Sequence, residues 1–210
     1  TFQESSNVFH QFQNLEFLSL VGSGAGAIGI KKPIMNNGAN MLFQKGIYSE
    51  ISLNEQLASG DDIFLLLNAK KKNKKAVHFI KSYDAIVRTN ACFSISDFFN
   101  QRIRWTSKSK TYRDFDIVFT SISVVLLNIS VLTLAMCSIL SHTALIWLVY
   151  ILITKTVFDL LLLIPVTFFF KQKKLLAYFI PLQLIYPFYI VTTFIFGMIG
   201  KFWWKNRKSQ

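Results

Sequence analysis

Three long apolar blocks dominate the second half of the chain. They occupy residues 117–140, 144–170 and 175–200. Each is longer than the roughly 20 residues that a helix needs to cross a bilayer, so the pattern predicts a helical membrane region. Pro181 and Pro187 interrupt the third block, and proline breaks the helical hydrogen-bond ladder. We therefore expect a kinked or re-entrant element there, whose end returns to the side from which the first block starts.

A shorter helical pattern covers residues 94–108, directly before the first block. Its apolar face carries Ile95, Phe98, Phe99, Ile103 and Thr106. Its polar face carries Asp97, Gln101, Arg104 and Lys108. An apolar stripe with a basic opposite face, next to a membrane block, is typical of a helix that lies in the membrane interface.

The first 93 residues show mixed signals. Helical spacing appears at 1–20 and 61–70, a turn signal at 36–38, and β-rich runs at 76–80 and 85–88. A glycine-rich stretch at 22–29 contains a GxGxxG-like pattern, but Pro33 follows too soon for the helix that a dinucleotide site requires. We interpret this stretch as a flexible segment of small residues that lies against the membrane or the active site.

Composition and charge predict a chain that is partly soluble and partly membrane-embedded. The chain is 52% hydrophobic and carries a net charge of +12, and most of its charged residues precede the first apolar block. The later basic residues flank the apolar blocks, as the positive-inside rule and anionic lipids place them. We therefore expect membrane lipids, and no nucleic acid, as partners. The run Lys70–Lys75 is interpreted as a solvated loop, with membrane contact as the alternative.

Two charged residues, Lys155 and Asp159, lie four positions apart inside the second block. This spacing puts them on one helix face, where they can pair. Charges at membrane depth usually have a partner or line a polar cavity. A structural pair is the first interpretation, and a path for a glycan or a lipid is the alternative.

The sequence predicts neither a disulfide nor a metal site. Cys137 lies in an apolar block and Cys92 in the polar part, which indicates a reducing, cytosolic environment. His78 has no partner at metal-ligand spacing, so no metal ligand is assigned. The first residues show no signal peptide. Because no initiator Met is present, we expect the chain to be the C-terminal part of a longer protein.

Two adjacent carboxylates, Asp61 and Asp62, follow Gly60 at the start of a predicted helix. They repel each other, so ionising both is costly unless a cation lies near. A carboxylate held in this way can accept the proton of a hydroxyl group that acts as a nucleophile. The alternative is helix capping, because Asp is favourable in the first turn, near free N–H groups and the positive end of the dipole.

The segment Gln101–Trp105 carries a second chemical signal. Arg104 offers a planar fork of donors that can bind phosphate oxygens in a bidentate way. Gln101 can bond to sugar hydroxyls or phosphates, and Trp105 offers a flat face on which a sugar ring can stack. The alternative is an interfacial helix, where arginine reaches lipid phosphates and tryptophan joins the aromatic belt.

The order of these signals resembles the membrane-bound family 2 glycosyltransferases, the inverting group that includes cellulose, chitin and hyaluronan synthases. In that family, an acidic motif that ends in the catalytic Asp precedes a Gln-x-x-Arg-Trp motif on an interfacial helix, and transmembrane helices follow. The matching residues here are Asp62, Gln101, Arg104 and Trp105. Further similar segments are 37–43 followed by Lys45, 88–90 and 204–207, so the resemblance spans nearly the whole chain.

The resemblance implies a fold and a division of the chain. Residues 1–93 would form the C-terminal part of an α/β GT-A domain, and residues 94–116 the interfacial helix. Residues 117–200 would form the transmembrane region, and residues 201–210 a basic tail. The implied location is a cell membrane, and the bacterial inner membrane is favoured. The chain would cross this membrane several times, with its catalytic part in the cytosol.

The implied reaction is transfer of a hexose, with inversion, from a nucleotide-sugar donor to a hydroxyl group of a glycan or lipid acceptor. Asp62 would be the catalytic base and Asp61 a supporting carboxylate. The other assigned residues would bind substrate: Gln101 and Arg104 at the diphosphate, Trp105 at the acceptor sugar, and Arg102 within the same motif.

The resemblance also implies a divalent metal, Mg or Mn, whose Asp-x-Asp motif is missing from this chain. Asp114–Asp116 has the right letters but lies at a membrane entry, where we interpret its carboxylates as solvated edge charges. We therefore expect the chain alone to lack most of the donor site and to be inactive. The competing class is a non-enzymatic membrane anchor or interaction protein. Only the enzyme requires Asp62, Arg104 and Trp105 to converge on one cleft.

Overall fold

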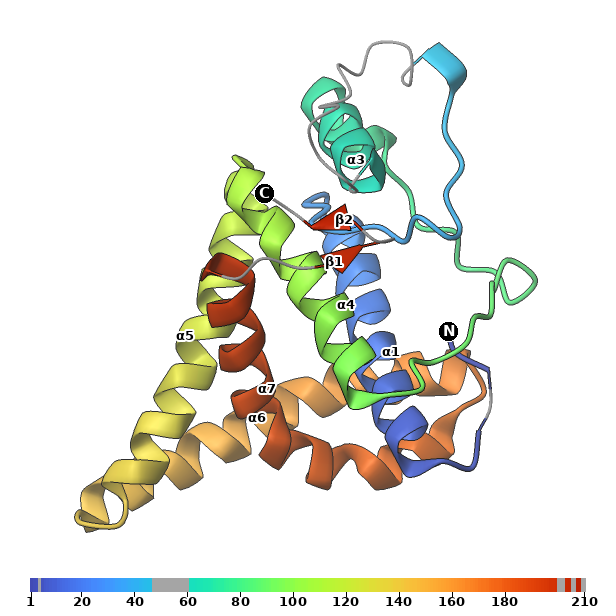
Figure 1. Cartoon of the computed structure of the whole chain (residues 1–210). Coiled ribbons are helices and arrows are strands. Elements are labelled where there is room, and N and C mark those ends of the chain that lie inside the picture. The colour runs from blue at the N-terminus through green and yellow to red at the C-terminus, as the bar shows by residue number, and fades with distance from the viewer. Residues whose placement is uncertain (4, 47–60, 200–202, 205–206, 209–210) are drawn as a thin grey trace.

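The described part of the structure is built almost entirely from helices (Figure 1). The computed structural model describes residues 1–3, 5–46, 61–199, 203–204 and 207–208. Its longer helices are α1 (Val8–Gly29), α3 (Asp61–Lys72), α4 (Ile95–Ser107), α5 (Phe115–Cys137), α6 (His142–Phe169) and α7 (Phe179–Ile199). Three short 3-10 helices are η1 (Lys74–Ala76), η2 (Lys108–Thr111) and η3 (Lys173–Tyr178).

The prediction that residues 1–93 form part of an α/β domain is wrong. The described strands are β1 (Trp203–Trp204) and β2 (Arg207–Lys208), which pair antiparallel near the C-terminus. The β-rich runs at 76–80 and 85–88 form no strand. A run of four or five residues cannot hold strand geometry without a neighbouring strand that satisfies its backbone groups. Residues 1–3 pair with the end of the second run through a single parallel bridge between Phe2 and Thr89, which is too short to make a strand, so the chain there stays irregular.

The expectation of a flexible segment at 22–29 is also wrong, because these residues complete the single helix α1. Asn7 caps the helix by accepting hydrogen bonds from two backbone N–H groups. The glycines allow close packing. A Cβ atom added to Gly22 would lie 2.6 Å from Cγ2 of Val166 in α6. A helix partner at that distance, which the local sequence does not reveal, offsets the low intrinsic helix propensity of glycine.

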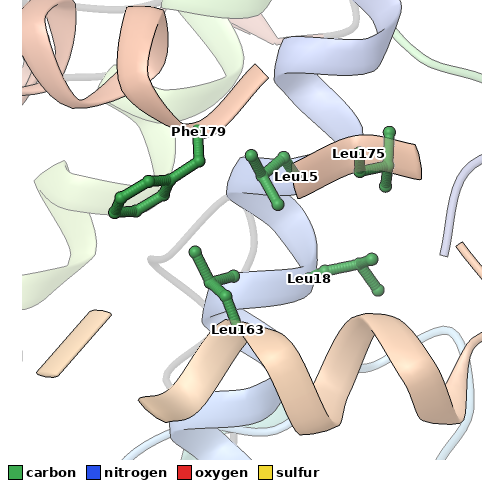
Figure 2. Close-up of a cluster of buried hydrophobic side chains, with 5 residues drawn as sticks. All are labelled: Leu15, Leu18, Leu163, Leu175 and Phe179. Atoms are coloured by element: carbon green, nitrogen blue, oxygen red, sulfur yellow. The ribbon is translucent and has the colours of Figure 1, made fainter. Parts of the chain in front are cut away.

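A buried apolar cluster joins α1 to the membrane helices. Figure 2 shows its five side chains, which come from α1, α6, η3 and the start of α7. They are Leu15, Leu18, Leu163, Leu175 and Phe179. Full burial of a side chain of this size contributes about 1.5–3 kcal/mol. This cluster therefore fixes α1 against the apolar half of the chain.

Three segments are long and apolar enough to cross a membrane: Phe115–Cys137, His142–Phe169 and Lys173–Ile199. Their bounds agree with the three predicted blocks. Two polar pairs lie inside these segments. Lys155 forms the predicted ion pair with Asp159, and the Gln183 amide donates a 2.7 Å hydrogen bond to the hydroxyl of Thr156.

The third segment bends back onto the polar half of the chain. Its start belongs to the cluster with α1, and α7 then lies along α4 and α5 (Figure 1). A Cβ atom added to Gly197 would lie 2.7 Å from the Thr106 side chain at the end of α4. Both ends of this segment thus meet helices of the polar half, and the re-entrant path stays a prediction. Pro187 lies inside α7 without ending the helix.

Candidate active site

Helix α3 carries the acidic pair, and its C-terminal end is anchored through a buried lysine. Lys70 is only 2% exposed, and its Nζ lies 2.6 Å from Asp114 Oδ1 and 2.8 Å from Asp116 Oδ2. The Asp114 carboxylate also caps α5 by accepting a hydrogen bond from the Ile117 backbone. The prediction that Asp114 and Asp116 are solvated edge charges is therefore wrong. The prediction that Lys70 belongs to a solvated loop is wrong as well.

Apolar packing fixes the other contacts of α3. Ile63 and Leu66 form a buried cluster with Ile117 of α5. This apolar face and the ion pairs of Lys70 connect α3 to α5, the first membrane helix. The start of α3, where the acidic pair lies, therefore has a defined position relative to the membrane region.

A turn of the preceding loop packs against Asp62. The Asn36 side-chain amide donates a 2.8 Å hydrogen bond to the Asp62 carbonyl oxygen. The predicted turn is confirmed by a bond from the Asn40 backbone N–H to the Asn37 carbonyl. A Cβ atom added to Gly38 would lie 2.8 Å from Asp62 Oδ2. Glycine is therefore required at this position if the carboxylate is to keep its place.

Helix α4 and η2 bring two cations and a phenol to Asp62. The carboxylate is close enough to influence the pKa of Arg104, Lys108 and Tyr112. Burial lowers the pKa of Arg104 and of Lys108, and the negative charge of Asp62 opposes this shift. Burial, and then Asp62, raises the pKa of Tyr112 well above its usual value. Asp61, in contrast, is exposed.

The opposite face of α4 contains a buried ion pair. The Arg102 guanidinium binds both carboxylate oxygens of Glu16 in α1, with 3.2 Å between Nε and Oε1. The Tyr189 hydroxyl of α7 donates a 3.0 Å bond to the same carboxylate. The guanidinium carbon lies 4.2 Å from the centre of the Trp105 ring and 4.7 Å from that of Phe98. Burial lowers the pKa of Arg102, but Glu16 and Tyr189 more than compensate, so the net shift is upward.

The remaining motif residues lie between these two faces. The Gln101 side-chain oxygen accepts hydrogen bonds from Arg102 and, over 3.7 Å, from the Cys92 thiol. Trp105 lies with its ring 6.5 Å from that of Phe17 in α1. The structure therefore places Asp62 near Arg104, while the described partners of Trp105 and Arg102 are residues of α1, α4 and α7.

The N-terminal end of α4 explains why the helix starts where it does. Ser94 accepts a hydrogen bond from the Asp97 backbone N–H, and its hydroxyl donates a 2.6 Å bond to the Asp97 carboxylate. Ser94 is therefore the N-cap of α4, and its hydroxyl also bonds the carboxylate of Asp97 in the first turn. The observed range, Ile95–Ser107, confirms the helix predicted at 94–108.

Sequence reasoning left two residues out of the site. Lys108 lies four positions after Arg104 and hence next to it on the helical face. That spacing was visible in the polar stripe, so Lys108 could have been found. Tyr112 follows η2, and nothing in the local pattern places it at the acidic pair.

The described residues do not offer a metal site. Across residues 1–3, 5–46 and 61–199, no three His, Cys, Asp or Glu side chains come together as ligands. Asp61 and Asp62 have Arg104 and Lys108 nearby, whose positive charges oppose cation binding. The implied metal therefore does not fit these residues, and the chemistry below does not use it.

A comparison with protein-family models matches residues 1–204 to the family described as "Glycosyl transferase family group 2". The match covers almost the whole chain. The chain therefore belongs to this family and is a glycosyltransferase, an enzyme class that uses a sugar donor and an acceptor. The searches of curated proteins and of solved structures gave no match.

Proposed function

We propose that this glycosyltransferase works at a membrane, where it moves a sugar from a nucleotide-sugar donor to a hydroxyl group of a glycan or lipid acceptor, with inversion. The proposal rests chiefly on the family match and on the position of Asp62, whose charge reaches Arg104 and Lys108. The three candidate membrane spans support the location. The order of the motifs supports membership of the group that contains cellulose, chitin and hyaluronan synthases.

In the proposed mechanism, Asp62 is the general base. Its carboxylate accepts the proton of the acceptor hydroxyl while that oxygen attacks the anomeric carbon of the donor. The bond from the anomeric carbon to the diphosphate oxygen breaks on the opposite face, so the configuration inverts. The leaving diphosphate takes the bonding electron pair and gains negative charge. Cations placed at such a position stabilise the developing charge.

Arg104 and Lys108 are the proposed cations. Both are half-buried, and interactions between charges strengthen where water is partly excluded. Arginine can bind two phosphate oxygens at once, whereas lysine acts as a compact point charge. Gln101 remains a proposed partner of the diphosphate, and Trp105 of the acceptor sugar.

Asp61 and Arg102 support the site in different ways. Asp61 is exposed and adds negative charge beside the base, which helps to keep Lys108 protonated. Arg102 is the proposed link that holds α4, and with it Arg104, against α1 and α7 through Glu16.

The substitution Asp62→Asn in the intact membrane-bound protein tests the role of the base. Asparagine keeps the size of the side chain and can still accept the hydrogen bond from Ile63 N–H, but it cannot take a proton. Loss of a general base typically lowers turnover about 100- to 10,000-fold. Asp84→Asn removes an exposed carboxylate elsewhere and is the matched control, with unchanged turnover expected. Near-parental turnover of Asp62→Asn in correctly inserted protein would contradict the assignment.

A further inference from the structure

A cavity of about 550 Å³ lies between the second half of α1, the end of α6 and the loop around residue 79. Its size is typical of a ligand pocket, for which roughly 300–1,000 Å³ is usual. None of the residues of the proposed active site lines it. Its lining has two chemically different parts, an apolar wall and a basic edge.

The cavity exists because the side chains on one face of α1 change in size. At 100° per residue, Leu15, Leu18, Gly22, Gly26 and Gly29 all fall on the face that meets α6. The two leucines fill the space, and Gly22 marks the closest approach to α6. Beyond that point, a Cβ atom added to Gly26 or Gly29 would meet nothing within 4 Å. The glycines thus leave open a space that leucines at the same positions would fill.

The wall of the cavity is apolar, and its edge is basic. The wall on α6 includes Pro165, Val166, Phe169 and Phe170. The edge includes Lys31, His78 and Lys81, all of which are exposed. No Asp or Glu is among the lining residues. A ligand that satisfies both parts carries a negative head and an apolar body.

The position of the cavity along α6 indicates where such a ligand comes from. α6 is long and apolar enough to span a membrane and ends at Phe169. Lys171, Lys173 and Lys174 follow directly. Basic residues at the end of a spanning helix usually lie at the level of the lipid head groups. The cavity is therefore lined by the part of α6 where hydrocarbon meets phosphate.

We propose that this cavity binds an anionic phospholipid. The phosphate would lie at Lys31 and Lys81, and an acyl chain would lie along the glycine face of α1 and against Phe169. A free phosphate would leave the apolar wall uncovered, and a zwitterionic lipid would gain less from the two lysines. The site is separate from the proposed sugar-transfer residues, so the proposal does not depend on the glycosyltransferase mechanism.

Photocrosslinking tests this proposal on the protein in nanodiscs of phosphatidylcholine. The probe is a phosphatidylglycerol with a photoreactive group in its acyl chain, and the same label on phosphatidylcholine is the reference. Mass spectrometry then maps the labelled peptides. We expect the phosphatidylglycerol probe to label residues 21–31 and 165–170 in preference to the reference probe. Equal labelling by both probes would overturn the proposal.

Two pairs of variants separate this cavity from general attraction to a basic protein. Lys31→Gln with Lys81→Gln should reduce the preference for the anionic probe by about fivefold for each lysine. Lys173→Gln with Lys174→Gln removes the same charge from exposed positions outside the cavity lining and should leave that preference unchanged. An equal loss in both pairs means that only the overall charge matters, which refutes a specific site.

A filling variant tests the cavity itself. Gly26→Leu places a side chain in the open space and should abolish labelling of the cavity segments, while lipid labelling of α5 persists and reports an intact fold. Ala135→Leu, at an exposed position on α5, is the control and should change nothing at the cavity. Unchanged cavity labelling in Gly26→Leu would overturn the proposal. So would full competition by inorganic phosphate, which would show a free-anion site instead of a lipid site.

Discussion

Removal of Glu16 should destabilise the protein more than loss of one ordinary hydrogen bond. The carboxylate of Glu16 is the partner of the Arg102 guanidinium and the acceptor of the Tyr189 hydroxyl. The side chains of Glu16 and Arg102 are only 4% and 3% exposed, so water cannot replace the lost partner. Glu16→Leu therefore leaves a buried cation and a buried phenol unpaired.

The expected magnitudes distinguish the ion pair from its surroundings. Removing one partner of a buried pair costs about 3–5 kcal/mol. We expect that loss for Glu16→Leu and for Arg102→Met alone. When both are replaced, no buried charge remains, and only the Tyr189 hydroxyl lacks its acceptor, at about 1–3 kcal/mol. The loss in the double variant should therefore be far smaller than the sum of the two single losses.

The assay is equilibrium unfolding of the purified protein in detergent micelles, followed by circular dichroism across a denaturant series. The four proteins of the cycle are compared at low and high salt, because a buried pair is screened much less than a surface pair. If the two single losses add up in the double variant, or if each is below about 1 kcal/mol, the pair does not hold α1 to α4 as described.

The same cycle distinguishes two roles for Arg102. If Arg102 contacts substrate, the double variant stays defective, with a raised KM for the donor. If Arg102 only positions α4, restored stability should restore most of the turnover. We expect the second result, because the Arg102 guanidinium is buried and already engaged by Glu16, Gln101 and two aromatic rings.

Three further predictions concern the surroundings of the acidic pair. Gly38→Ala should lower kcat by up to roughly 100-fold through displacement of the adjacent carboxylate. Gly46→Ala, where the added Cβ meets nothing within 4 Å, should not, and equal turnover of the two variants would contradict this. Lys70→Met should reduce the free energy of unfolding by about 2 kcal/mol, since its two aspartates keep some access to water, whereas exposed Lys71→Met should have no effect. The pKa of Lys108 is lowered by burial, so its charge is lost at a lower pH than that of a free lysine, and the donor KM should rise on the alkaline side. Lys108→Arg should move that rise to higher pH. The same pKa shift predicts that the contribution of Lys108 to the free energy of unfolding increases as the pH rises from the lowered value to 10.5. An identical KM profile in the arginine variant would exclude Lys108 from the donor site.

The parts of the fold that could be predicted are those whose signal is local. The three membrane-length segments follow from continuous apolar runs, and α4 follows from an apolar stripe opposite a polar one. The pair Lys155–Asp159 follows from a spacing of four on one helix. The turn around Asn37 follows from residues that favour turns.

The parts that failed depend on partners distant in the sequence. Lys70 looked like the first residue of a solvated basic run because its partners lie more than forty positions later. The continuity of α1 through its glycines depends on the approach of α6 at Val166. The β-rich runs have suitable residues, but the pairing that the described structure gives the second run is a single bridge between Thr89 and Phe2, more than eighty positions earlier. Local propensity gives way wherever packing supplies the larger free energy.

Helix α1 shows how the two halves of the molecule depend on each other. One of its faces meets α6 and η3 through Leu15 and Leu18 and then opens into the cavity beyond Gly22. The neighbouring face meets α4, where Phe9 packs on Phe98 and Glu16 holds Arg102. Helix α1 therefore contacts both the membrane helices and the helix that carries Arg104. A change in the spacing of α1 and α6 would therefore also act on the side of α1 that supports α4.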